Sequence, residues 1–216
     1  MARRTKEDAL ATRNKLLDSA EYLFQSQGVS RTSLQDIARR AGATRGAVYW
    51  HFSDKADLFN AMIERVTLPL ESAFSDDADL RPSSSSVDVD ALLKIRQATV
   101  KALRQIVNDA QTRRVFEVAT QKVEYVDELR TVRLRHLAIR QGFVSRFEQS
   151  IESAAQREKL LLPMPAAMAA RGFHALIDGL IQNWLLDQTA FDLLDVGQRA
   201  MNIYLTGLGF SIAPEK

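Results

Sequence analysis

Several side chains between Thr44 and Lys55 have the chemistry to bind a phosphate group or the edge of a nucleic-acid base. Arg45 carries a planar fork of hydrogen-bond donors that fits guanine or phosphate, and Gly46 beside it lets a helix backbone approach a ligand closely. Tyr49 and His51 can donate hydrogen bonds to phosphate oxygens. These residue types, at this spacing, indicate contact with nucleic acid.

Five residues extend this candidate surface. Thr44 stands where a helix begins, so its amide and hydroxyl groups can point towards an anion, and Arg31 and Thr32 precede another helix in the same way. Lys55 opposes the dipole of the helix that follows it, a small cost that a phosphate contact explains. Trp50 lies at the boundary of the outward face. The candidate DNA-binding residues are Arg31, Thr32, Thr44, Arg45, Gly46, Tyr49, Trp50, His51 and Lys55.

Two short helices joined by a tight turn are expected to position these side chains. Thr32 is predicted to cap the first helix while Gln35 reaches back to the amide of the cap, which is a capping box. Gly42 can adopt the left-handed conformation that ends a helix, and Thr44 caps the second helix. The first helix has one apolar stripe, formed by Leu34, Ile37, Ala38 and Ala41. The pattern predicts a helix-turn-helix, with a plain helical hairpin as the alternative.

Helices on both sides complete the expected unit. Residues 9–27 carry an apolar stripe, and Val48 and Phe52 are spaced to face it from the second helix of the motif. A further helix is predicted to start at Ser53, and Pro69 predicts a kink or a break in it. Residues 1–56 hold ten Lys and Arg against six Asp and Glu, whereas the rest of the chain has a net charge of −2. The basic excess therefore accompanies the helix-turn-helix, as DNA binding requires.

The composition narrows the possible classes of protein. The chain has 216 residues, of which 46% are hydrophobic and 26% charged, so it can form one large domain or two small ones. It contains no cysteine, only three scattered histidines, and neither an H-E-x-x-H nor a P-loop sequence, so we expect no metal, no cofactor and no enzymatic activity. It has no apolar run long enough for a membrane span and no apolar signal core, which predicts a cytoplasmic protein.

The rest of the chain predicts further helices and no strand of any length, so the expected fold class is all-α. A serine- and aspartate-rich loop is expected at 75–90. Helices are predicted at about 89–108, 111–122, 127–157, 166–186 and 193–210.

The last two predicted helices indicate an interface. The helix at 166–186 is apolar on two sides and must be covered on both, either by a second subunit in a four-helix bundle or within the chain. The residues predicted to form a dimer interface are Phe173, Leu176, Leu180, Trp184, Val196 and Ile203.

The segment GATRGAVYWHFSDKADL resembles the recognition-helix signature of the TetR/AcrR family of bacterial transcriptional regulators, and the resemblance extends back to Met1. Beyond residue 65 it is looser, although RRVFEVATQKVEYVDEL and ALIDGLIQNWLL are similar to segments of the multidrug-efflux repressors of this family. The resemblance implies an all-helical homodimer with a helix-turn-helix DNA-binding domain, here residues 1–56, and a ligand-binding and dimerisation domain, here residues 57–216.

The resemblance also implies a cavity for a small hydrophobic or drug-like inducer. Carried over by position, Phe116, Thr120 and Asp178 lie at this cavity, and the apolar Phe116 stands where relatives often have a polar side chain. A carboxylate on an apolar helix face can equally be a structural group that is hydrogen-bonded within the fold, and this alternative applies to Asp178. The candidate ligand-binding residues are Phe116, Thr120, Phe143, Phe147, His174, Ile177 and Asp178.

The expected function is that of a ligand-responsive repressor. The dimer is expected to bind a palindromic operator in double-stranded DNA, to be released by the ligand and to control a multidrug efflux operon. The alternatives are a helical ligand-binding protein without DNA activity and a transcriptional activator with a different regulon.

Overall fold

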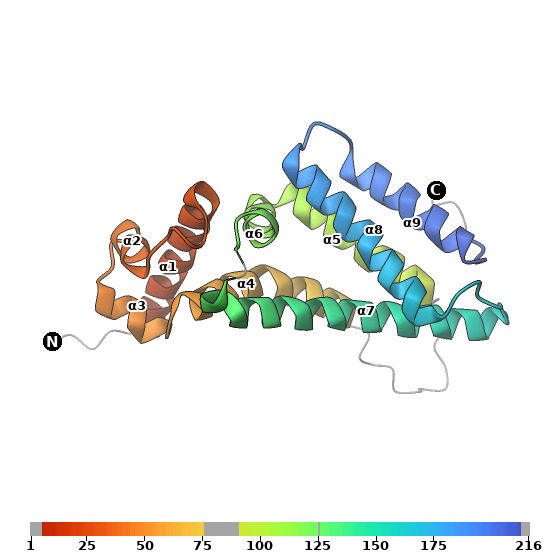
Figure 1. Cartoon of the computed structure of the whole chain (residues 1–216), viewed down its shortest axis with the longest axis horizontal. Coiled ribbons are helices and arrows are strands. Elements are labelled where there is room, and N and C mark those ends of the chain that lie inside the picture. The colour runs from red at the N-terminus through yellow and green to blue at the C-terminus, as the bar shows by residue number, and fades with distance from the viewer. Residues whose placement is uncertain (1–5, 76–90, 125, 213–216) are drawn as a thin grey trace. The chain divides into compact units, whose positions relative to one another are not determined.

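The protein is helical throughout the part of the chain that the structure, a computed structural model, describes: residues 6–75, 91–124 and 126–212. Its elements are α1 Lys6–Gln27, α2 Leu34–Arg40, α3 Arg45–His51, α4 Lys55–Ser75, α5 Ala91–Asn108, α6 Ala110–Gln121, the short 3-10 helix Asp127–Leu129, α7 Arg130–Glu158, α8 Ala166–Leu186 and α9 Leu193–Gly207 (Figure 1). No strand occurs among these residues, which confirms the all-α prediction. The loop predicted at 75–90 lies outside them, apart from Ser75, which ends α4.

The chain forms two compact units, each made of two segments. The first unit comprises residues 1–69 and 110–136, and the second comprises residues 70–109 and 137–216. The division falls inside α4 and α7. A compact unit is defined by contacts and a functional domain by activity, so the predicted domain boundary at residue 56 stays a prediction.

The core of the first unit joins α1 to the two helices of the turn motif. Leu16 and Phe24 on α1, Ile37 on α2 and Val48 on α3 have no exposed surface and belong to one cluster. This confirms the packing predicted from their spacing. The cluster also includes Val115 of α6, which the sequence placed in the larger body. Periodicity identifies the apolar face of a helix but not the helix that covers it.

Helix α4 continues without interruption through Pro69, from Lys55 to Ser75. The predicted break near Pro69 is therefore absent. A proline inside a helix removes one backbone donor, and the helix can continue when only that one hydrogen bond is missing.

In the second unit, α9 packs against both α5 and α8 (Figure 1). Glycines permit the close approach, because a side chain at Gly197 would collide with Leu103 and one at Gly172 would collide with Tyr204. The hydroxyl of Tyr204 donates to the Ala169 carbonyl at 2.8 Å, and burial raises the pKa of that hydroxyl. These contacts fix α9 on α5 and α8.

Two residues predicted at a dimer interface instead lie in the core of the second unit. Phe173 is 1% exposed and packs edge-on against Phe147, with ring centroids 4.9 Å apart, and Trp184 is 5% exposed. Their assignment to the interface was wrong. The sequence pattern shows two apolar faces on α8 but does not show which of them packs against other helices of the same chain. Of the other predicted interface residues, Ile203 is 73% exposed, and the half-buried ones are Leu176, Leu180 and Val196.

Candidate nucleic-acid interface and ligand residues

The helix-turn-helix begins with a capping box one residue later than the sequence predicted. The Ser33 hydroxyl accepts a hydrogen bond from the Asp36 amide at 3.1 Å, and the Asp36 carboxylate accepts one from the Ser33 amide at 3.2 Å. The prediction of Thr32 and Gln35 as the box was wrong. The hydrogen bonds from Ser33 lower the pKa of the Asp36 carboxyl below its ordinary value of 3.8.

Thr32 has a different structural task. It is 1% exposed, and its hydroxyl donates to the Gly28 carbonyl at 2.7 Å and accepts from Gln27 at 3.2 Å. This side chain closes the end of α1 and is not placed to hold a phosphate, so its assignment to DNA binding is corrected. Arg31 beside it is exposed.

The turn between α2 and α3 has the predicted geometry. Gly42 has a φ of 64°, which is the left-handed region that favours glycine, and Ala43 N donates to Ala38 O at 2.9 Å across the helix end. The Thr44 hydroxyl then accepts from Ala47 N at 3.2 Å and caps α3. The backbone therefore enters α3 in one defined direction.

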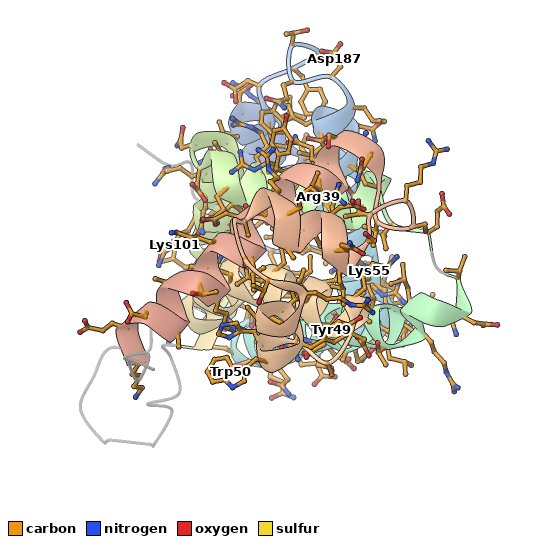
Figure 2. The ribbon with its side chains drawn as sticks, turned by 90° about the vertical axis from the view of Figure 1, so that its left-hand side faces the viewer. Arg39, Tyr49, Trp50, Lys55, Lys101 and Asp187 are labelled. Atoms are coloured by element: carbon orange, nitrogen blue, oxygen red, sulfur yellow. The ribbon has the colours of Figure 1, made fainter. Side chains whose placement is uncertain are left out.

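The outward face of α3 carries Arg45, Tyr49 and Trp50, whereas His51 at the end of the helix is half-buried. Tyr49 is 49% exposed and Trp50 is 72% exposed. The Arg45 guanidinium lies over the Tyr49 ring, 5.5 Å from its centroid, and the His51 ring meets Trp50 edge-on at 4.5 Å. Figure 2 shows Trp50 standing clear of the ribbon at the end of α3. The face thus combines an arginine fork with apolar ring surface.

Two cations lie beside this face. The Lys55 ammonium donates to the Ser30 carbonyl at 3.4 Å, so it links the start of α4 to the turn before α2. Arg13 of α1 lies over the ring of Phe52, 5.3 Å from its centroid. Sequence reasoning missed Arg13, because it lies on a different helix from the motif and only the folded unit places it at the end of α3.

The predicted ligand residues are distributed over both units. Phe116 and Thr120 lie on α6 in the first unit, where Phe116 packs against the core and its carbonyl accepts from the Thr120 hydroxyl at 2.8 Å. The members in the second unit are Phe143, Phe147, His174, Ile177 and Asp178. Gln182 donates to the Asp178 carboxylate at 2.5 Å, which is a hydrogen bond within the fold of the kind that the structural alternative predicts. The ligand site stays a prediction.

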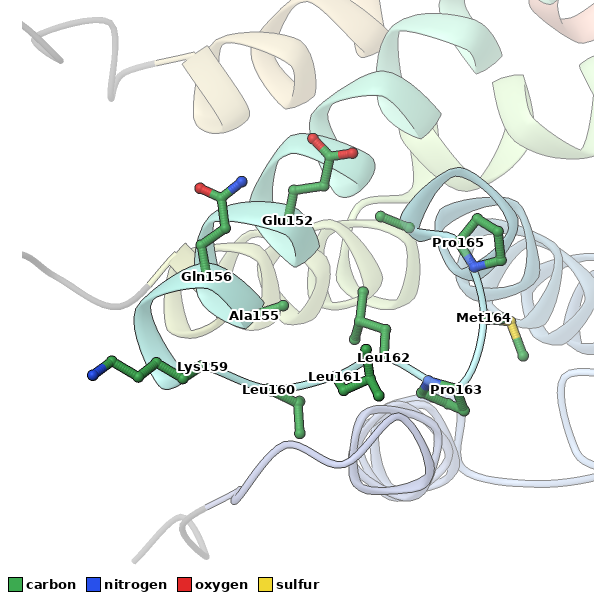
Figure 3. A pocket seen from close by; sticks show the side chains of 11 residues that line it. Glu152, Ala155, Gln156, Lys159, Leu160, Leu161, Leu162, Pro163, Met164 and Pro165 are labelled. Atoms are coloured by element: carbon green, nitrogen blue, oxygen red, sulfur yellow. The ribbon is translucent and has the colours of Figure 1, made fainter.

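An open groove in the second unit has a volume of about 700 Å³ (Figure 3). It is lined by the end of α7, the segment 159–165 and Ala166, with the charged side chains of Glu152 and Lys159 near a row of leucines and prolines. None of the predicted ligand residues lines it. Over the described ranges, no group of three or more potential ligand side chains could hold a metal ion, and no helix is long and apolar enough to span a bilayer.

Comparison with known proteins assigns the chain to a family. Residues 16–62 match the model of bacterial regulatory proteins of the tetR family, and residues 90–210 match the C-terminal region of MAATS-type transcriptional repressors. The chain is 35% identical over 216 residues to the HTH-type transcriptional regulator TtgR of Pseudomonas putida, with all of both chains covered. The chain belongs to the TetR family of transcriptional regulators. Its C-terminal half is that of a MAATS-type repressor.

Solved structures agree with this assignment. NalD, the secondary repressor of the MexAB-OprM multidrug efflux pump in Pseudomonas aeruginosa, has 37% sequence identity and a TM-score of 0.81, with 94% of this chain and 98% of NalD covered. The complex of SmeT with triclosan has 27% identity and a TM-score of 0.76, with 95% and 100% covered. SmeT is the repressor of the multidrug efflux pump SmeDEF of Stenotrophomonas maltophilia.

The capping box generates a prediction about α2. Replacing Ser33→Ala should destabilise the protein by about 1 kcal/mol, the typical cost of losing a serine cap, and should return the Asp36 pKa towards its ordinary value. Because the pKa is lowered in the folded protein, the stabilisation is present above the unfolded pKa and is lost as the pH falls through the folded pKa. NMR titration of Asp36 and chemical unfolding at pH 7 measure the two effects. Ser26→Ala, at an exposed serine on α1, is the control and should change neither the stability nor the Asp36 pKa. If the pKa of Asp36 in S33A were the same as in the wild type, the capping box would be contradicted.

Proposed function

We propose that this protein is a dimeric repressor that occupies an operator in double-stranded DNA and is released by a small hydrophobic or drug-like ligand. The observation that carries the proposal is the outward face of α3, where Arg45, Tyr49 and Trp50 are exposed on a capped helix-turn-helix. Family membership supplies the class of activity. A regulator of this kind is non-catalytic and works in the bacterial cytoplasm.

Each contact on this face has a definite chemical role in the proposal. Arg45 binds guanine or phosphate, and Gly46 lets α3 approach the groove without a side chain between. Tyr49 and His51 donate to phosphate oxygens, and the flat apolar face of Trp50 packs on sugar or a thymine methyl group. Arg31, Thr44 and Lys55 add phosphate contacts at the ends of three helices.

The proposed ligand and regulon follow from the relatives. NalD and SmeT are repressors of multidrug efflux pumps, and SmeT binds triclosan. We infer that this chain responds to a ligand of similar chemistry and controls an efflux operon. The residues proposed to contact the ligand are Phe116, Thr120, Phe143, Phe147, His174, Ile177 and Asp178.

A second copy of the chain is proposed to cover the outer faces of α8 and α9. Met168 and Leu186 on α8 are 60% and 72% exposed, and Ile203 on α9 is 73% exposed. Large apolar side chains on adjacent helices are costly to leave in water and suit a two-fold bundle of four helices. Leu176, Leu180 and Val196, all half-buried, extend this surface.

Operator binding tests the function directly. The purified protein should select a palindromic duplex from a random library. Arg45→Ala should raise the dissociation constant about five- to 140-fold, because a bidentate base contact is worth about 1–3 kcal/mol, and Tyr49→Ala should raise it through the loss of a phosphate contact. Fluorescence anisotropy at fixed salt measures the change. Lys101→Ala removes an exposed charge from α5, outside the face of α3 and the proposed dimer surface, and is the control. Selection of no duplex would refute the repressor and activator assignments and leave a helical ligand-binding protein.

The dimer is tested separately. Ile203→Glu places a charge in the proposed interface, so the protein should sediment as a monomer at concentrations where the wild type is a dimer. Leu161→Glu changes an apolar residue that is 93% exposed outside this surface and is the matched control. Analytical ultracentrifugation distinguishes the two, and a dimeric I203E protein would show that the interface lies elsewhere.

A further inference from the structure

Helix α6 lies alongside α1 in a parallel register. Gln111 at the start of α6 donates to Glu21 at 3.0 Å, Gln25 donates to Glu117 at 2.8 Å, and Val29 N donates to Lys122 O at 3.1 Å. The partners are separated by 90 to 93 positions along the chain, so the offset is nearly constant over the length of α6. These contacts hold α6 as a fourth helix of the unit that carries the helix-turn-helix.

A buried carboxylate lies at one end of this seam. Glu21 is 1% exposed and lies among apolar side chains of α1, with Leu17 and Phe24 one turn away on each side. Its carboxylate accepts a short hydrogen bond from Arg65 of α4, and its second oxygen lies 3.7 Å from the Arg114 guanidinium of α6. One side chain therefore binds α4 and α6 to α1.

The energetics of Glu21 differ from those of the surface pair beside it. A buried carboxylate must be matched by cations and donors, and removing it leaves its partners with an uncompensated charge. Arg65 also pairs with Asp18 at 2.7 Å, but the Asp18 side chain is 64% exposed and such pairs contribute little. Asp18 is thus a natural control that shares a partner with Glu21.

We propose that Glu21 is a positioning residue for DNA binding. This inference rests on the proposed function. Glu21 acts on the DNA-binding residues through α1. Helix α1 packs on α2 and α3, and the Glu21 ion pairs connect α1 to α4 and α6. Weakening these ion pairs lets α3 shift relative to Lys55 at the start of α4. The cluster of Glu21, Arg65 and Arg114 thereby maintains the spacing of the residues that meet DNA. None of these three residues lies on the outward face of α3.

Three variants test the proposal on the full-length protein with the selected operator duplex. Glu21→Gln removes the charge at nearly constant shape, Arg114→Gln removes only the ion pair between Glu21 and α6, and Asp18→Asn is the control. Stoichiometric titration at high DNA concentration gives the active fraction, and dilute titration gives the dissociation constant of the active molecules. We expect that dissociation constant to rise about tenfold in R114Q and further in E21Q, and to stay within about twofold in D18N.

The two readouts separate positioning from mere stability. A purely structural role lowers the active fraction and the melting temperature but leaves the dissociation constant of the active molecules unchanged, and that result would overturn the proposal. If E21Q does not fold, R114Q decides, because the Arg114 side chain is partly exposed and the change is milder.

Hydrogen exchange supplies a readout that needs no DNA. In R114Q, peptides from α2 and α3 should exchange faster than in wild type, while peptides from α8 and α9 in the other unit stay unchanged. Unchanged exchange in α2 and α3 would also overturn the proposal. If the wild type selects no duplex, the proposed function fails on its own, and the exchange experiment still decides the role of Glu21.

Discussion

The burial of Val48 determines which side chains of α3 face outwards. Val48 has no exposed surface and Phe52, which ends the helix, is 2% exposed, so one side of this seven-residue helix is held in the core of the first unit. A helix held by one side presents the opposite side to solvent. Arg45, Tyr49 and Trp50 are outward for this reason. The left-handed turn at Gly42 and the cap at Thr44 set where the helix begins, and together with Val48 they define the reading face.

The unit that carries this face is larger than a three-helix domain. Helix α6, which follows α5 in the chain, contributes Val115 to the same core and meets α1 through Glu21 and Gln25. The arrangement gives the first unit a polar seam between α1 and α6, and its geometry depends on directional hydrogen bonds in addition to apolar packing. A repressor needs such rigidity, because contacts from two copies must meet one operator at a fixed spacing.

Caps, turns and the outward residues of a helix could be predicted from the sequence. Which helix packs on a given apolar face could not. The glycine turn, the Thr44 cap and the outward residues of α3 depend on neighbours within a few positions, so spacing alone predicted them. The first cap was misplaced because Thr32 and Ser33 are adjacent hydroxyl residues and only the fold shows that Thr32 turns inwards. Phe173 and Trp184 were misassigned because the partner of an apolar face is another helix far along the chain. Glu21 was missed although the sequence holds its signal, a carboxylate at an apolar position of the α1 stripe.

In the proposed complex, two copies of α3 occupy successive major grooves on one face of an operator. Hydroxyl-radical footprinting of the wild-type protein on its selected duplex tests this most directly, because it reports which backbone positions the protein covers. We expect two protected segments on each strand, centred about 10 base pairs or a multiple of one helical turn apart and related by a two-fold axis. A single protected segment, or two segments out of phase with the helical repeat, would contradict it.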